Sequence, residues 1–142
     1  MKKSICIILC AIIALSIAAC GSSTPPAPTP APTPEPVPDL IGEWEQTNKN
    51  SEDSYQIATI TDNVIEVFWK TPDMQALYWS GTFTPPTAAG SYSWESAADH
   101  EKTDFAIMAA SADTKTFTYS NGELSYEVQA MGVTTTVRMA KK

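Results

Sequence analysis

Residues 115–139 read KTFTYSNGELSYEVQAMGVTTTVRM, and this stretch decides the fold class. Apolar residues alternate with hydroxyl and charged residues in three runs, which are separated by Asn121-Gly122 and Met131-Gly132. Alternation of period 2 is typical of an antiparallel strand with one buried and one solvated face. Asn-Gly favours a tight hairpin, because a type I′ turn needs positive φ at both central residues. The stretch therefore predicts three antiparallel strands joined by short turns.

The same alternation continues over residues 39–142, which contain all 13 aromatic residues of the 142-residue chain. Turn-forming pairs such as Asp62-Asn63 and Pro85-Pro86 separate the runs, and connections this short favour a meander. The class predicted for this domain is all-β: a small antiparallel meander closed into a barrel or a curled sandwich. We expect eight or nine strands, near residues 42–47, 55–61, 64–70, 76–83, 91–97, 104–110, 115–120, 123–130 and 133–139.

The start of the chain has a different character. Lys2 and Lys3 precede an apolar run from Ser4 to Ala19, which is shorter than the about 20 residues that cross a bilayer as a helix. A charged start, a short apolar run and small residues before a break are typical of an export signal. Residues 1–19 are therefore predicted to be a signal peptide.

The end of this segment carries a resemblance. Ile17-Ala18-Ala19-Cys20 resembles the lipobox of bacterial lipoproteins, with Ile17 where the family usually has Leu. The resemblance implies cleavage before Cys20 and attachment of acyl chains, such as palmitate, to that residue. Two or more acyl chains hold a protein stably on a bilayer. We therefore expect Cys20 to anchor the mature protein on the extracytoplasmic face of the cell membrane.

A proline-rich segment separates this anchor from the β domain. Residues 21–38 read GSSTPPAPTPAPTPEPVP and hold 8 of the 11 prolines. Alternating proline removes amide donors and fixes φ, so residues 20–38 are predicted to form a semi-rigid disordered stalk. Gly21 and Ser22 follow the lipidated cysteine without an Asp. This favours the surface of a Gram-positive cell, with the outer membrane of a Gram-negative cell as the alternative.

Charge and cysteine content exclude several classes of function. Of the 9 lysines and arginines, Lys2 and Lys3 leave with the signal peptide, so 7 cations face 16 acidic residues and the net charge becomes −9. Affinity for nucleic acid depends on clustered cations, so a nucleic-acid partner is not expected. The folded domain has no free cysteine and one histidine, His100, which does not supply a zinc site. We expect neither metal nor cofactor.

A second resemblance concerns the two ends of the domain. Gly42 and Trp44 form a Gly-x-Trp motif on the first expected strand, and Arg138 lies on the last. This looks like the lipocalin pattern, in which an early Trp closes one barrel end and a late Arg packs over it. The alternation places Arg138 on the outer face. An ordinary core position for Trp44 remains the alternative.

Two further groups of residues are candidates for function. Phe68, with Tyr78 on the following strand, is a possible exposed binding patch, although scattered surface aromatics are also normal. The loop from Asp99 to Asp104, which includes His100, is the densest polar turn and a candidate for catalysis. No nucleophile, phosphate-loop or dinucleotide motif is present, so an enzyme is not expected.

Three hypotheses for function follow from these observations. The first is a non-catalytic module that binds an envelope or extracellular protein. A lipobox, a stalk and a compact domain resemble, in layout alone, the superinfection-exclusion lipoproteins of temperate phages. The second is a lipocalin-like carrier of a small apolar ligand. Bulky aromatics such as Trp69, Trp79, Trp94 and Phe105 favour a filled interior over a carrier. The third is an enzyme that uses the Asp99–Asp104 loop.

The anchor leads to a direct prediction. Cys20→Ala should leave an uncleaved precursor or release unacylated protein, because the acyl acceptor is gone. Cys10→Ala is the matched control, since Cys10 lies inside the expected signal peptide and its loss should leave acylation intact. Intact-protein mass spectrometry of membrane and medium fractions measures both. Acyl mass on the N-terminus of Cys20→Ala would contradict the anchor.

Overall fold

The computed structural model describes residues 35–130 and 132–142. The expected signal peptide, Cys20 and most of the stalk lie outside the described residues. The described part contains one short helix, α1 (His100–Thr103), and eight strands: β1 (Gly42–Gln46), β2 (Tyr55–Thr61), β3 (Val64–Lys70), β4 (Gln75–Thr82), β5 (Tyr92–Ala98), β6 (Thr114–Ser120), β7 (Glu123–Ala130) and β8 (Val133–Lys141).

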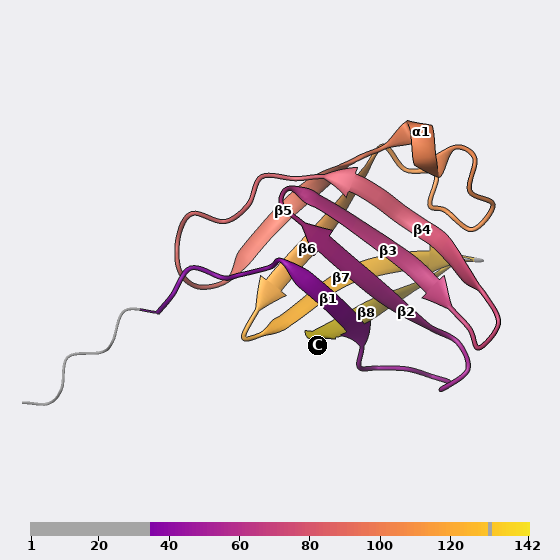
Figure 1. Ribbon diagram of the computed structural model, residues 1–142, viewed down its shortest axis with the longest axis horizontal. Helices are drawn as coiled ribbons and strands as arrows, with labels where there is room; N and C mark the ends of the chain where they lie inside the picture. The colour runs from indigo at the N-terminus through magenta and orange to yellow at the C-terminus, as the bar shows by residue number, and fades with distance from the viewer. Residues whose placement is uncertain (1–34, 131) are drawn as a thin grey trace, which may run out of the picture. The chain divides into compact units, whose positions relative to one another are not determined.

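The strands form a closed antiparallel barrel in sequence order (Figure 1). Each strand pairs with the next, and β8 pairs back with β1 through Trp44↔Lys141 and its neighbours. At the β6–β7 turn Asn121 has φ 52° and Gly122 has φ 83°, as a type I′ hairpin requires. The prediction of an all-β meander is confirmed, and the sheet closes into a barrel.

One expected strand is absent. Residues 104–110 belong to a loop that follows α1, and Phe105 is 87 % exposed. The main-chain oxygen of Asp99 accepts hydrogen bonds from the N–H groups of Lys102 and Thr103, so a helical turn begins where the sheet was expected to continue. Residues 105–110 are apolar at nearly every position and lack the polar alternation of a half-buried strand. The expectation of a strand here, with Phe105 in the core, is wrong.

The interior of the barrel is filled by aromatic rings. Trp94 stacks on Phe83 at 4.9 Å and on Phe117 at 5.6 Å between ring centroids. Phe117 in turn lies 5.0 Å from Tyr126. Trp79 is fully buried, and Trp69 packs at the edge of this core. Aromatic pairs in this geometry add about 0.5–1.5 kcal/mol each beyond the area they bury.

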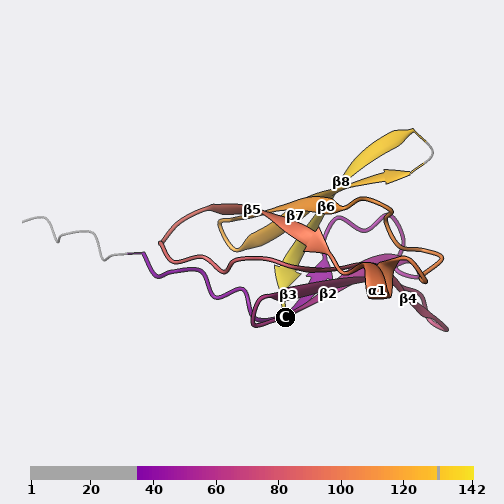
Figure 2. The same cartoon turned by 90° about the horizontal axis from the view of Figure 1, so that it is seen from above.

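The barrel has two ends, which are visible in both views (Figure 1, Figure 2). The chain enters the domain at one of them, named here the stalk end, which also carries the β2–β3, β4–β5 and β6–β7 connections. The antiparallel order places the β1–β2, β3–β4, β5–β6 and β7–β8 connections at the opposite end, named here the far end. The far end is thus opposite the end of the barrel at which residues 35–41 lead into β1.

The shortest seam of the barrel lies between β4 and β5. β4 and β5 pair only through Gly81↔Ala98 and Thr82↔Ala97. Beyond these rungs the β5–β6 loop takes over, and the N–H of Ala110 donates to the Tyr78 oxygen at 2.9 Å. A Cβ atom on Gly81 would clash with the Ala97 carbonyl oxygen, so glycine is needed for this close approach.

The seam between β6 and β7 ends before the far end is reached. Their ladder stops at Phe117↔Tyr126, whereas β7 and β8 remain paired as far as Ala130↔Val133. The outer part of the β7–β8 hairpin therefore projects from the barrel wall at the far end, as Figure 2 shows. A gap opens between the start of β6 and this hairpin.

The core and the β5–β6 loop generate a paired prediction. Phe117→Ala should lower the free energy of unfolding by about 3–5 kcal/mol, because it leaves a cavity in a packed core. Phe105→Ala is the matched control and should change it by less than about 0.5 kcal/mol, because that ring is exposed. Urea unfolding followed by tryptophan fluorescence measures both. Equal losses would contradict the exposed position of Phe105.

Candidate functional site

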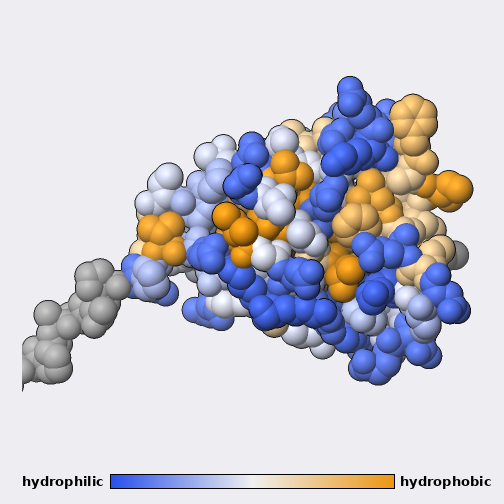
Figure 3. Space-filling model, in the orientation of Figure 1, coloured by the Kyte–Doolittle hydropathy of each residue, from blue (hydrophilic) through white to orange (hydrophobic). Residues whose placement is uncertain are grey.

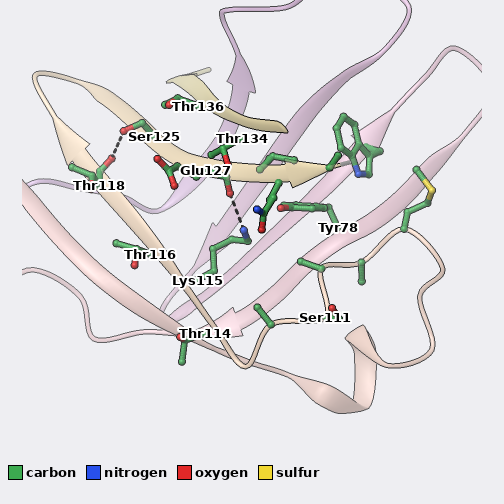
Figure 4. A pocket seen from close by; sticks show the side chains of 18 of the residues that line it. Tyr78, Ser111, Thr114, Lys115, Thr116, Thr118, Ser125, Glu127, Thr134 and Thr136 are labelled. Atoms are coloured by element: carbon green, nitrogen blue, oxygen red, sulfur yellow. Dashed lines mark hydrogen bonds between the residues drawn. The ribbon is translucent and has the colours of Figure 1, made fainter. Parts of the chain in front are cut away.

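The gap between β6 and β7 is one side of a groove of about 1060 Å³ at the far end (Figure 4). Residues 107–112 of the β5–β6 loop form one wall, and the β7–β8 hairpin forms the other. Trp69, Tyr78 and Lys115 lie at its floor. The walls are rich in hydroxyl side chains, contributed by Ser111, Thr114, Thr116, Thr118, Ser125, Thr134 and Thr136.

Lys115 is the charged group of this floor. It lies two residues before Phe117 and thus on the inward face of β6, where it is half-buried. Its ammonium donates to the main-chain oxygen of Glu127 at 2.9 Å and lies 5.0 Å from the centre of the Tyr78 ring. In the described part of the chain no carboxylate lies within ion-pair distance of it.

Burial sets the protonation behaviour of the floor. It lowers the pKa of Lys115 from its usual value, and the negative charge of Glu127 acts in the opposite direction. Burial raises the pKa of Tyr78 to about 12, and burial also raises the pKa of Tyr126 well above its usual value. Both phenols are therefore protonated at neutral pH and offer hydroxyl groups for hydrogen bonding.

A buried polar pair lies behind the floor. The Tyr126 hydroxyl donates to the side-chain oxygen of Gln56 at 2.6 Å, and Gln56 is fully buried on β2. The amide nitrogen of Gln56 has no hydrogen-bond partner in the structure. A buried polar group is costly unless it is hydrogen-bonded. The Tyr126 hydroxyl meets this need for the side-chain oxygen of Gln56, and this bond holds the two side chains together.

Exposed apolar side chains are numerous at the far end, and two of them, Ile107 and Met108, line the groove. Five of the seven large apolar side chains that are exposed in the described chain lie at the far end. We name them the far-end patch: Met74, Phe105, Ile107, Met108 and Val133. Ile107 is 100 % exposed. Figure 3 shows apolar surface gathered toward this end of the domain, next to strongly hydrophilic areas.

Sequence reasoning missed Lys115 and misplaced Tyr78. Tyr78 is buried, with 6 % of its surface exposed, so it forms no exposed patch with Phe68, which is half-buried. The register of β3 and β4 shifts at this point: Phe68 pairs with Leu77 and Val67 with Trp79, which leaves Tyr78 as an extra residue. Such a bulge reverses the alternation and turns Tyr78 inward. The inward Lys115 was visible in the K-x-F-x-Y alternation of β6.

The three residues expected to close the stalk end of the barrel, Gly42, Trp44 and Arg138, have different surroundings in the structure. Trp44 is fully buried and its indole N–H donates to the Leu40 oxygen at 3.0 Å. Arg138 points outward between two buried neighbours of β8 and bonds Glu123 at 2.5 Å. Lys141 occupies this end instead: it pairs with Trp44 across the ladder and its ammonium lies 2.9 Å from the Asp39 carboxylate.

Gly42 has a clear role in that arrangement. Its φ is +134°, and a Cβ atom there would come within 2.9 Å of the Lys141 side chain. A glycine admits both the backbone conformation and the close approach. At the stalk end both residues of the Gly-x-Trp motif therefore lie next to Lys141: Gly42 through the close approach and Trp44 as its cross-strand partner.

The Asp99–Asp104 loop contains α1 and a histidine held by carboxylates. The His100 ring lies 3.0 Å from Asp104 and 3.3 Å from Asp113, and all three side chains are exposed. Asp104 is the main cause of a raised His100 pKa. Within residues 35–130 and 132–142, no three His, Cys, Asp or Glu side chains are grouped to hold a metal ion.

Comparison with protein-family models found no match, and none was found among curated proteins or solved structures. No helix in the described ranges has the length and apolar character needed to cross a membrane.

His100 provides a prediction that is simple to measure, because it is the only histidine. Its pKa should exceed 6.5, since the Asp104 carboxylate favours the protonated ring. A raised folded pKa means that this contact stabilises the fold below the unfolded pKa, and that the contribution is lost as pH rises through the folded value. NMR titration of the ring should show the pKa falling in Asp104→Asn. A wild-type pKa at or below 6.5 would contradict the contact.

Proposed function

We propose that this protein is a lipid-anchored, non-catalytic interaction module that displays its far end away from the membrane. The observation that carries the proposal is the far-end patch: five exposed apolar side chains lie at the end opposite the stalk. Single exposed apolar residues are normal on soluble proteins, whereas a group of them marks an interaction site. We expect an anchor at Cys20 and a proline-rich stalk to attach the domain to the membrane through the end of the barrel at which β1 begins, which leaves the far end as the unattached end.

The partner proposed is another protein, either of the cell envelope or arriving from outside. A site away from the membrane suits a partner that approaches from the exterior, as in phage superinfection exclusion, which the layout of the chain resembles. The absence of Asp after Cys20 favours a Gram-positive surface, with a Gram-negative outer membrane as the alternative. The large net negative charge of the mature chain argues against nucleic acid as the partner.

A lipocalin-like carrier is the second candidate. The eight-stranded closed barrel is compatible with such a barrel, and the aromatic floor of the groove at Trp69 and Tyr78 favours an apolar ligand there. The stack of Phe83, Trp94, Phe117 and Tyr126 argues against it, because these rings occupy the space that a carrier keeps for its ligand. An interaction module is therefore preferred.

Site-specific photocrosslinking tests the proposal on the full anchored chain in its own cells. Benzoylphenylalanine at Phe105 or Met108 should give a protein-sized crosslink. The same probe at Asn121, an exposed turn residue of the stalk end, is the matched control and should give none.

Two outcomes would overturn the interaction module. One is a crosslink of equal yield at both ends. The other is the absence of any protein crosslink, together with a small bound mass in native mass spectrometry that organic solvent removes. The second outcome would establish the carrier.

A further inference from the structure

We propose that the groove between β6 and β7 accepts an extended peptide of the partner as an added strand on the free edge of β7, with a carboxylate side chain of that peptide on Lys115. This inference rests on the proposed function, because it names how a protein partner is bound. It is carried by the main-chain groups of β7 that no neighbouring strand pairs with and by the half-buried cation beside them.

The free edge follows from the register of β7 and β8. On β8, the N–H of Arg138 donates to the Asn48 side chain and its C=O accepts from the N–H of Thr47. Both groups thus point toward β1, so Ser125↔Arg138 is a pair without mutual main-chain hydrogen bonds. Such pairs recur every second residue.

The alternation continues along the projecting hairpin. Glu127↔Thr136 and Gln129↔Thr134 are the next pairs of this kind. The main-chain N–H and C=O groups of Glu127 and Gln129 therefore point away from β8 and into the gap. The hydrogen bond from Lys115 to the Glu127 oxygen, 2.9 Å long, agrees with this direction. The β6–β7 ladder has already ended at Phe117↔Tyr126, so no strand covers these groups.

The two edges of the hairpin are treated differently. On the β8 side, Asn48 acts as a cap: its amide donates to the Thr136 oxygen at 2.8 Å and its side-chain oxygen accepts from the N–H of Arg138. The corresponding stretch of β7, Glu127–Ala130, has neither Pro nor Lys, the residues that commonly protect an exposed edge. A two-stranded hairpin is marginal by itself, so a third strand would stabilise it.

Lys115 gives the groove its charge preference. It is half-buried, its ammonium bonds one neutral carbonyl, and no described carboxylate pairs with it. A cation that is partly desolvated gains from an anionic partner more than an exposed one does. An aspartate or glutamate of the incoming strand supplies that partner, while the hydroxyl groups of the walls suit the other side chains. The chain's own stalk is a poor occupant, because alternating proline lacks the N–H groups that pair with an edge.

The experiment uses random nine-residue peptides displayed on phage as the probe, selected on the full chain in detergent. Recovered peptides should contain an acidic residue. In Gln129→Pro their affinity should fall at least about tenfold, because proline removes the N–H that faces the gap and main-chain bonds supply the affinity of strand addition. Thr134→Pro is the matched control: it alters the other member of the same pair, whose N–H faces the β8 edge, and should change affinity by less than about twofold. Lys115→Met, which keeps the apolar stem, should weaken the acidic peptides about tenfold.

Hydrogen exchange on the unmodified chain provides a second measurement. Bound peptide should slow exchange of the Gln129 amide at least about tenfold and leave that of Thr134 unchanged. The proposal is overturned if no peptide is enriched over selection on Gln129→Pro, if both proline variants lose binding equally, or if exchange at Gln129 does not slow. It is also overturned if the chain alone forms a dimer that protects Gln129, since a second copy would then fill the edge. A crosslink at Phe105 that persists in Gln129→Pro would show that the interaction module stands while strand addition fails.

Discussion

The cross-strand pair of Phe117 and Tyr126 is the contact on which the other features of the domain depend. It is the last rung between β6 and β7, and its rings, 5.0 Å apart, continue the aromatic stack of the core. On the side of this pair toward the stalk end, β6 and β7 are hydrogen-bonded and the interior of the barrel is filled. On the side toward the far end the two strands separate, which exposes the edge of β7 and lets the Lys115 side chain reach the main-chain oxygen of Glu127. One pair thus marks the boundary between the part of the barrel that is packed and the part that is open.

The sequence predicted what depends on local pattern. Alternation placed all eight strands within about two residues of their bounds and gave the tight turn at Asn121-Gly122. It failed at two places. The bulge at Tyr78 reflects how β4 fits against β3, a contact between strands that leaves no mark on the period of the chain. The path of residues 104–110 follows a local helical turn that begins at Asp99, and the unbroken apolar run of residues 105–110 was a sign against a half-buried strand there.

The candidate site was predictable only in part for the same reason. The inward position of Lys115 could be read from its spacing to Phe117, but the end of the β6–β7 ladder could not, because it is a property of paired strands. Arg138 was correctly placed on the outer face, and the expectation that it covers Trp44 came from a resemblance to lipocalins. In the structure the cation that lies across the ladder from Trp44 is Lys141. The strands can thus be predicted from the local sequence pattern, whereas the places where neighbouring strands separate cannot.

The two-rung seam between β4 and β5 has a consequence for how the domain responds to force and to binding. A closed barrel resists opening because every strand has two neighbours, and here the weakest link is completed by the β5–β6 loop through Ala110 and Tyr78. The same loop carries Phe105, Ile107 and Met108. A partner that binds these side chains and exerts force on them therefore applies that force directly to the seam between β4 and β5. A partner that immobilises them stabilises the closed barrel. The resistance of the barrel to opening and the binding of a partner at the far end are thus coupled. The link is a stretch of ten residues of irregular chain, Asp104 to Asp113.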